Sequence, residues 1–267
     1  MRDSLPGAEF WAMLRPHTGE VTEVRRTERG FSSDLTALVV CEAGVFFVKA
    51  VRNRQGGRLD SLTRERLISP HVLSLSPALR WAAENPAWVA LGFEAVPGRH
   101  ADFTRGSPDL SAVVGLVDRI GRLELPQVAE GWAESRWDRF AEDDAEAALF
   151  AGDVLLHTDI NESNILLSGR AARVVDWAWP TRGAGFIDPA SLALQLIAAG
   201  HAAGDAERWA SGCVAWRDAD PKGLDAFAAA NVRMYRHLSD RRPDAEWLAA
   251  MLRAAEAWAG HRGLTIP

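Results

Sequence analysis

One polar loop between apolar runs constrains this sequence more than any other feature. The segment 155–167 reads LLHTDINESNILL, and a further apolar run after it ends at Asp176. Turn-forming residues at 168–170 separate the two later runs, so we expect a β-hairpin there. Asp159, Asn164 and Asp176 would then lie near one another. Their side chains offer oxygen ligands, which suit a hard cation such as Mg²⁺ that completes its shell with water and substrate phosphates.

The polar loop has two interpretations. Asp159, Asn161 and Asn164 are ordinary turn formers, but apolar flanks would bury an unexplained polar cluster, which costs free energy. The pattern His157-x-Asp159-x-x-x-x-Asn164, followed by an apolar strand ending in Asp176, resembles the catalytic loop and metal-binding aspartate of the protein-kinase-like fold. Tryptophan follows that last aspartate and no glycine comes next. In this the chain resembles the aminoglycoside phosphotransferase and choline kinase superfamily of small-molecule kinases.

The resemblance covers residues 21–200 and implies a role for each residue of the loop. Asp159 is the expected catalytic residue, which positions the acceptor hydroxyl and accepts its proton. Asn164 and Asp176 are the expected ligands of Mg²⁺. His157 is expected to brace the loop rather than to act as the base.

Three further residues near the loop are open to interpretation. Asn161 either touches the metal or shapes the turn. Thr158 stands where glycine is common in the small-molecule kinases, and because a β-branched residue disfavours positive φ, we expect ordinary backbone there. Asp188, followed by Pro189, is typical of a helix N-cap with proline at the first helical position, and we expect it also to steady the catalytic loop.

Lysine is rare in this chain. Of 30 basic residues only Lys49 and Lys222 are lysine, so a lysine that ends the apolar run 45–48 is unusual. It either guards an edge strand against aggregation or resembles the kinase lysine that contacts the α- and β-phosphates. The second interpretation needs an acidic partner on the next helix, and Glu65 fits best. The alternative for Glu65 is a solvated helix charge.

The remaining nucleotide contacts are expected from order along the chain. There is no Gly-x-Gly-x-x-Gly pattern. Ser32 and Ser33, with nearby backbone N–H groups, are the expected phosphate contacts, whereas Asp34 would repel phosphate unless it turns away. The segment around Glu94 and Val96 resembles the hinge of the kinase-like fold, where backbone groups would hold adenine.

The hydrophobic patterns predict an α+β fold of the protein-kinase-like type. We expect a small antiparallel β-rich N-terminal lobe at residues 1–97 for the nucleotide, and a larger, mostly helical C-terminal lobe at 98–267 with the catalytic loop and the acceptor-binding helices. The expected strands are 21–26, 35–41, 45–51 and 88–96. The expected helices are 9–14, ended by Pro16, then one from 62, and, beyond 110, stretches at 110–123, 132–150, 188–200, 224–238 and 247–258.

Composition excludes several other classes of protein. The chain has 267 residues, 48% of them hydrophobic and 25% charged, with a net charge of −6. That charge gives no general attraction to nucleic acid or to anionic membranes, and no apolar stretch is long enough to span a bilayer. The N-terminus has no apolar run like a signal peptide. Cys41 and Cys213 are expected to be buried free thiols, so we expect a cytoplasmic protein. We expect it to be a monomer or a dimer.

The predicted activity is phosphorylation of a hydroxyl group on a small molecule, with ATP or GTP and Mg²⁺. An aminoglycoside-like or other cationic antibiotic is the leading acceptor, which would make the protein a resistance enzyme. A metabolic kinase acting on an amino alcohol, sugar or amino acid is one alternative, and a nucleotide-binding pseudokinase is another.

Two groups of residues could belong to the acceptor site. Trp177 and Trp179 either line the acceptor site or pack between elements. An acidic run is either a solvated helix face or a wall for a cationic acceptor: Glu142, Asp143, Asp144 and Glu146.

Overall fold

The computed structural model describes residues 5–27, 33–169 and 171–266. These residues form two compact units. Unit 1 consists of the described residues up to Pro97 together with Val175–Trp179. Unit 2 consists of the described residues from Gly98 to Val174 and from Pro180 onward.

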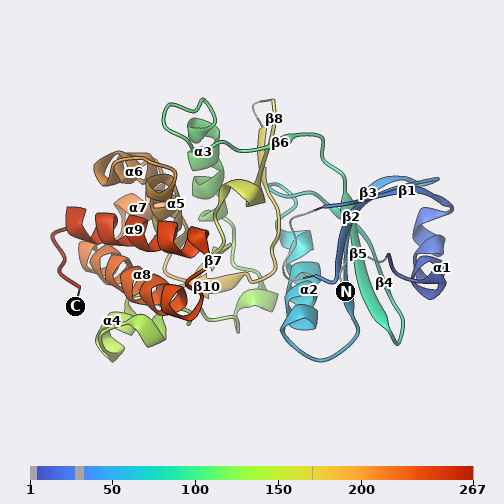
Figure 1. The fold of residues 1–267 in the computed structure, drawn as a ribbon, viewed down its shortest axis with the longest axis horizontal. Coiled ribbons are helices and arrows are strands. Elements are labelled where there is room, and N and C mark those ends of the chain that lie inside the picture. The colour runs from blue at the N-terminus through green and yellow to red at the C-terminus, as the bar shows by residue number, and fades with distance from the viewer. Residues whose placement is uncertain (1–4, 28–32, 170, 267) are drawn as a thin grey trace. The chain divides into compact units, whose positions relative to one another are not determined.

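Unit 1 is built on an antiparallel sheet of five strands in the order β1-β2-β3-β5-β4 (Figure 1). Gly44 has a φ of 122° at the turn between β2 and β3, a conformation that glycine adopts at no steric cost. β4 was not expected from the sequence, because Trp81 is its only buried residue and no alternation marks it. Its pairing with β5 makes it a strand. The strands are β1 Val21–Arg26, β2 Leu35–Cys41, β3 Gly44–Arg52, β4 Leu79–Glu84 and β5 Trp88–Glu94.

Two helices cover opposite faces of this sheet, as Figure 1 shows. Phe10 and Leu14 of α1 (Ala8–Thr18) pack on one face. Leu62 of α2 (Gly57–Ile68) packs on the other, where the short 3₁₀ helix η1 (Ser69–His71) follows it. Successive residues of a strand point to opposite faces. Val48 and Ala50 of β3 therefore lie on the α1 face, and Val51 lies on the α2 face.

The first helix is longer than the sequence predicted. Pro16 was expected to end it, but α1 continues to Thr18. Proline disrupts a helix mainly by removing a hydrogen bond to the preceding turn. Pro16 lies in the last turn, so little helix follows the break, and Gly19 closes the helix by donating its N–H to the carbonyl of Arg15 at 2.9 Å.

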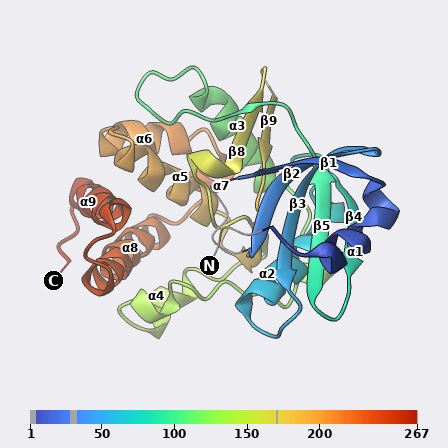
Figure 2. The same cartoon turned by 45° about the vertical axis from the view of Figure 1, so that its right-hand side comes forward.

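Unit 2 is mainly helical and has two small sheets (Figure 2). The expected hairpin is present: β8 (Ile165–Ser168) pairs antiparallel with β9 (Ala171–Val174), and β6 (Arg99–His100) adds a third strand. β7 (Val154–Leu156) pairs with β10 (Thr181–Gly183) and leads directly into the polar loop. The helices are α3 Leu110–Ile120, α4 Asp144–Ala148, α5 Ile187–Ala198, α6 Ala203–Ala210, α7 Val214–Arg217, α8 Pro221–Arg241 and α9 Glu246–His261.

The stretch 132–150 is not the helical segment that was expected. It contains only the 3₁₀ turn η3 (Asp138–Phe140) and the five-residue α4, after another 3₁₀ turn, η2 (Gln127–Ala129). Its large aromatic residues are buried one at a time: Trp137 packs against Phe227 of α8 with ring centroids 4.8 Å apart. Each aromatic residue reaches the core from an irregular segment of backbone, so the segment can bury them without forming a helix.

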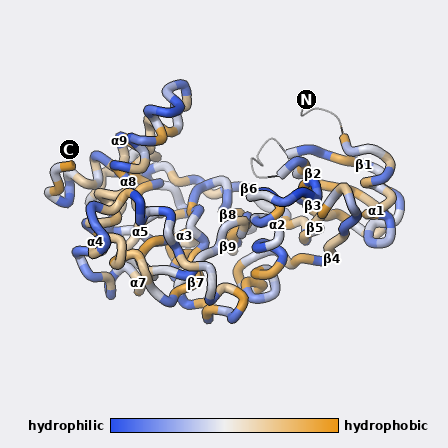
Figure 3. The backbone as a smooth tube through the Cα atoms, turned by 90° about the horizontal axis from the view of Figure 1, so that it is seen from below, coloured by the Kyte–Doolittle hydropathy of each residue, from blue (hydrophilic) through white to orange (hydrophobic). Residues whose placement is uncertain are grey.

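Phe227 and Trp258 lie at the centre of the unit 2 core, on the neighbouring helices α8 and α9. In Figure 3, hydrophilic and hydrophobic residues alternate along these helices, as amphipathic packing requires. The described residues include no helix with the length and apolar character needed to cross a membrane. A β-rich unit and a helical unit together confirm the predicted α+β, protein-kinase-like fold class.

Candidate active site

A buried lysine joins two carboxylates in unit 1. Lys49 Nζ donates to both oxygens of Glu65, at 2.7 and 2.9 Å, and to Oδ1 of Asp176 at 2.8 Å. Lys49 is 6% exposed and Glu65 is 4% exposed. Lys49 lies on β3 between the two inward-facing residues Phe47 and Val51, so its side chain points toward α2, where Glu65 lies. The structure thus brings together three residues from widely separated parts of the sequence.

The position of Lys49 excludes the edge-strand interpretation. β3 lies between β2 and β5 in the sheet and has no free edge. A lysine that guards an edge must also reach solvent, and this one does not. Nor is Glu65 a solvated helix charge. A buried charge pair is costly unless each group is satisfied, so these contacts are needed to keep either residue here.

The charges of this group support one another. Burial opposes the charged form of Lys49, but the carboxylates of Glu65 and Asp176 outweigh it and raise the pKa of Lys49 above its ordinary value. Burial also raises the pKa of Glu65, and the ammonium group of Lys49 offsets part of that effect. A charged lysine is therefore held on the α2 face of the sheet.

Asp176 and the two tryptophans after it are fixed differently. Asp176 has a φ of 67°, in the left-handed region that side chains other than glycine, asparagine and aspartate rarely adopt. Trp177 is buried and donates its indole N–H to Ser76 Oγ at 2.7 Å, so it packs within unit 1. Trp179 is 40% exposed, and the guanidinium carbon of Arg64 lies 5.2 Å from its ring centroid. Trp177 therefore packs within the unit, whereas Trp179 lies at the surface.

In unit 2 the polar loop fixes the carboxylate of Asp159 on both sides. Asn161 Nδ2 donates to Oδ1 at 2.9 Å and Asn164 Nδ2 donates to Oδ2 at 2.8 Å. Asn161 also accepts the N–H groups of Ser163 and Asn164 at 2.9 and 3.2 Å and so caps the 3₁₀ turn η4 (Glu162–Asn164). Asn161 therefore shapes the turn. Asp159 itself is exposed, so it can reach a molecule outside the protein.

His157 and Asp188 support this loop from behind. His157 is buried, and its Nδ1 accepts the N–H of Asp159 at 3.3 Å, as a bracing residue would. Asp188 accepts the N–H groups of His157 and Thr158, each at 2.8 Å. Burial raises the pKa of Asp188, and the neighbouring His157 side chain and the two backbone N–H groups act in the opposite direction.

Two expectations about these supporting residues were wrong. Asp188 is not an N-cap: α5 begins at Ile187 after Phe186, and the Asp188 carboxylate is used on the loop instead. Thr158 does not adopt an ordinary backbone, because its φ is 65°. The reason is that its N–H, its carbonyl and its hydroxyl are all bound, the last two by Arg136 at 3.0 Å each. Together these bonds offset the steric cost of the conformation.

Sequence reasoning missed Arg136. It lies 22 residues before Thr158 in a segment that was expected to be helical, and this chain is rich in arginine. Only the fold brings its guanidinium group to the loop. The sequence carries no signal that could have found it.

The two expected magnesium ligands are Asn164 of unit 2 and Asp176 of unit 1, and each offers an oxygen atom. Asn164 turns its amide N–H group toward Asp159, which leaves its oxygen for another partner. Asp176 supplies a carboxylate that is already paired with Lys49. In the described part of the chain no group of three or more His, Cys, Asp or Glu side chains is arranged to hold a metal. Oxygen donors in small number are typical of Mg²⁺ sites completed by phosphates.

The other predicted nucleotide contacts are less defined. Ser32 lies outside the described residues, and Ser33 lies in irregular structure before β2. Asp34 turns toward β3: its carboxylate accepts the N–H of Arg52 at 2.8 Å and pairs with Arg58, which offsets its charge. Glu94 ends β5, donates its N–H to the Ala78 carbonyl at 2.8 Å and pairs with Arg80 at 3.3 Å. Val96 follows that strand. The roles of the two serines, Glu94 and Val96 stay predictions.

The acidic run is partly used within the fold. Asp143 caps α4 by accepting the N–H of Glu146 at 2.8 Å. Glu146 is paired with Arg233 of α8 at 3.0 Å, and Glu142 lies 3.8 Å from the same arginine. One residue of the run therefore caps α4 and two lie beside Arg233 of α8, which weakens the case for a continuous acidic wall.

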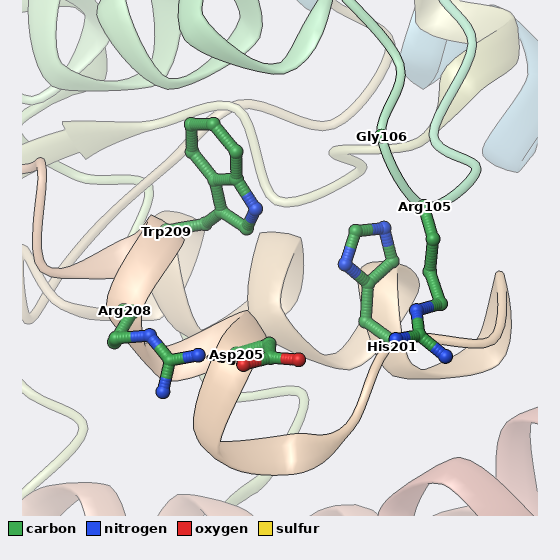
Figure 4. Close-up of a pocket in the computed structure, with 6 residues that line it drawn as sticks. All are labelled: Arg105, Gly106, His201, Asp205, Arg208 and Trp209. Atoms are coloured by element: carbon green, nitrogen blue, oxygen red, sulfur yellow. Dashed lines mark hydrogen bonds and ion pairs between the residues drawn. The ribbon is translucent and has the colours of Figure 1, made fainter.

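A separate cavity of about 510 Å³ lies in unit 2, and no predicted site residue lines it. Figure 4 shows Arg105 and Gly106 on a loop and Asp205, Arg208 and Trp209 on α6, with His201 between them. Three of its polar side chains already have partners: Arg208 pairs with Asp205, and His201 Nε2 bonds to the Phe103 carbonyl at 2.9 Å. This cavity is not part of the candidate active site.

Solved structures resemble this chain, whereas comparisons of sequence find no match. No family model matches the chain, and no curated protein matches it in sequence. A thermostable mutant of aminoglycoside phosphotransferase APH(4)-Ia has a TM-score of 0.64 at 14% identity, over 95% of this chain and 99% of that one. Choline kinase LicA from Streptococcus pneumoniae has a TM-score of 0.64 at 12% identity, over 94% and 98%. Amicoumacin kinase hAmiN has a TM-score of 0.62 at 12% identity, over 96% and 94%.

This chain has the fold of the aminoglycoside phosphotransferases and choline kinases. The match spans nearly the whole of each chain, and it confirms the resemblance that the polar loop and the strand ending in Asp176 predicted. At this level of identity the likeness concerns the fold, and the kinase-like fold hosts acceptors of different kinds. Chemistry must therefore be inferred from the site.

Proposed function

We propose that this chain is a phosphotransferase that moves the γ-phosphoryl group of ATP or GTP to a hydroxyl group of a small molecule. The buried Lys49, held between Glu65 and Asp176 on an interior strand, is the observation that supports this most strongly. The buried charge pair of Lys49 and Glu65 is costly to maintain, and a lysine in an arginine-rich chain is a specific choice. Perturbed charged groups of this kind are typical of functional sites.

Unit 1 is proposed to bind the nucleotide. Lys49 would contact phosphate oxygens, with Glu65 keeping its ammonium group charged and oriented. Ser33, Glu94 and Val96 are the further contacts proposed for this unit, along with Ser32. Several solved structures of similar fold contain nucleotides: AMP-PNP in amicoumacin kinase hAmiN, GDP in aminoglycoside 2'-phosphotransferase-IIIa and AMP in LicA. These complexes support a nucleoside phosphate as the ligand.

Unit 2 is proposed to supply the base. Asp159 would hold the acceptor hydroxyl and accept its proton as that oxygen attacks the γ-phosphorus, while the bond to the nucleoside diphosphate breaks with its electron pair. The two asparagine contacts fix the carboxylate, so little reorganisation is needed. Mg²⁺, when bound, would offset charge on the phosphate oxygens. Asn164 and Asp176 are the residues proposed to hold it.

The acceptor class has two candidates. The similar structures include kinases of aminoglycosides, of amicoumacin and of macrolides, which favours an antibiotic acceptor and a role in resistance. A choline kinase of equal similarity favours a metabolic acceptor such as an amino alcohol. Because Asp143 caps α4 and Glu146 pairs with Arg233 of α8, the acidic run adds little weight to a cationic antibiotic. A cytoplasmic location, where ATP is abundant, is proposed with either.

A nucleotide-binding pseudokinase is the rival from another class, and one experiment separates the two. The purified chain is incubated with Mg²⁺ and ATP or GTP in the presence of a panel of aminoglycosides, macrolides, amino alcohols and sugars, and product mass is measured. We expect a mass gain of one phosphoryl group on at least one acceptor.

Two variants test the proposed roles. Asp159→Asn should abolish transfer while nucleotide binding persists. Lys49→Arg should impair it although the charge is kept, because a planar guanidinium does not replace a compact ammonium. Nucleotide binding without turnover by the wild type would favour the pseudokinase.

A further inference from the structure

The residue before the proposed base is held in a conformation that its type disfavours. Thr158 has a φ of 65°, and for a β-branched side chain this is an uncommon, strained state. It is also buried. The direction in which the chain leaves Thr158 decides where Asp159 points, so whatever fixes Thr158 also fixes the proposed base.

Two side chains hold Thr158, one from each side. Asp188 accepts its N–H, and Arg136 reaches the opposite groups with both ends of its guanidinium fork. Nη1 donates to the Thr158 carbonyl and Nη2 donates to its Oγ1, each at 3.0 Å. A glycine at this position would adopt positive φ without help, but it would lack the hydroxyl. The threonine and the arginine therefore depend on each other.

Arg136 is itself anchored to the frame of unit 2. Its N–H donates to Oε1 of Glu134 at 2.6 Å, and Oε2 of the same glutamate accepts from the Thr181 hydroxyl on β10 at 2.7 Å. Its guanidinium carbon lies 5.1 Å from the ring centroid of Trp137, which is buried against α8. Although Arg136 is exposed overall, its backbone is linked through Glu134 to β10, and its guanidinium fork bonds to the catalytic loop.

We propose that Arg136 is a positioning residue that holds Thr158 in the left-handed conformation and thereby sets the carboxylate of Asp159. This rests on the proposed function, because it concerns the same phosphoryl transfer. Arg136 acts through Thr158 in unit 2, whereas the nucleotide is proposed to bind unit 1. Substitution of Arg136 should lower the rate of the chemical step while leaving nucleotide affinity in place, since nucleotide binding is proposed for unit 1.

The test uses Mg²⁺ and ATP with water as the acceptor, so no acceptor need be known. Arg136→Met should lower kcat for ADP formation by about 10- to 100-fold, as small misplacements of a catalytic group do, with KM for ATP within about twofold. The matched control is Arg139→Met, three residues away: Arg139 is also exposed and lies over an aromatic ring, that of Phe140 at 4.7 Å. It should leave kcat unchanged. Arg136→Lys, which keeps the charge but loses the fork, should be impaired like Arg136→Met.

A rescue variant separates positioning from direct action. Arg136→Met with Thr158→Gly removes both the fork and the strain that it holds, so most of the lost kcat should return. If the double variant stays as slow as Arg136→Met, or if Arg136→Lys is fully active, Arg136 acts as a charge and the inference is wrong. Hydrogen exchange of the peptide 155–166 gives a readout without turnover. Exchange should quicken in Arg136→Met and not in Arg139→Met, and equal exchange in both would also overturn the proposal.

The outcomes separate this inference from the proposed function. If the wild type neither binds nor hydrolyses ATP or GTP, the proposed function fails, whatever Arg136 does. If the wild type turns over nucleotide and Arg136→Met does so equally well, only the inference fails. Thermal unfolding of every variant shows whether a loss of rate comes from loss of the fold instead.

Discussion

At the residue scale, the group around Lys49 makes a prediction about stability and pH. Removing one partner of a buried charge pair leaves the other charge uncompensated, which typically costs about 3–5 kcal/mol. Lys49→Met leaves the buried Glu65 beside Asp176 with no ammonium group. We expect a loss of that size in the free energy of unfolding at pH 8, measured by urea titration.

The loss should shrink at lower pH. Burial already raises the pKa of Glu65, and without Lys49 that pKa rises further above its unfolded value. The folded variant then binds a proton more readily than its unfolded chain, so its stability increases as pH falls through the raised pKa. In the wild type the contribution of Lys49, whose pKa is raised, is fully present at every pH below its unfolded value. The gap between the proteins should therefore be smaller at pH 5.5 than at pH 8.

A control variant checks the cause. Lys49→Met with Glu65→Gln removes both buried charges, so its stability should depend less on pH than that of Lys49→Met alone. A gap that is the same at both pH values in the single variant would show that Glu65 does not carry the uncompensated charge.

At the scale of elements, two glycines should respond to alanine in opposite directions. A Cβ on Gly92 of β5 would lie 2.0 Å from the Trp81 ring of the neighbouring strand β4. That overlap forces a buried ring to move, and overpacking of this kind costs about 1–3 kcal/mol. Gly115 lies inside α3, where an added Cβ meets nothing within 4 Å. Alanine there should stabilise the helix by about 0.5–1 kcal/mol.

Thermal unfolding of Gly92→Ala and Gly115→Ala measures both effects in one background. Gly92→Ala should lower Tm and Gly115→Ala should raise it. Equal shifts of the same sign would mean that the contact between β4 and β5 is looser than the described packing.

The elements also show what the sequence could and could not reveal. Runs rich in β-branched and other apolar residues predicted β2, β3 and β5, and the strand β1 was also expected. β4 and β10 gave no pattern, since pairing with another strand and not periodicity makes them strands. The same holds within the site. Asp159, Asn164 and Asp176 stand in a recognisable order, whereas Arg136 reaches Thr158 only through the fold. The positive φ of Thr158 could not be predicted from its residue type, because hydrogen bonds outweigh the preference of threonine for negative φ.

At the scale of the whole molecule, nucleotide binding and chemistry are proposed to belong to different units, and this can be tested by ligand-induced stability. A ligand that binds only the folded state stabilises it by about 2.7 kcal/mol at one hundred times its dissociation constant. ATP with Mg²⁺ should therefore raise the Tm of the wild type, and by more than ATP with EDTA, since the cation offsets phosphate charge.

Two aspartates should then separate the roles of the units. Asp159→Asn keeps an acceptor oxygen within the asparagine contacts of the loop, and it leaves unit 1 untouched, so the full Mg²⁺-dependent rise in Tm should persist while transfer is lost. Asp176→Ala removes both a proposed metal ligand and a partner of Lys49. It should lose the extra rise due to Mg²⁺ and retain at most the smaller shift seen with EDTA. An undiminished Mg²⁺ effect in Asp176→Ala would remove Asp176 from the metal site, and a lost nucleotide shift in Asp159→Asn would mean that unit 2 also binds the nucleotide.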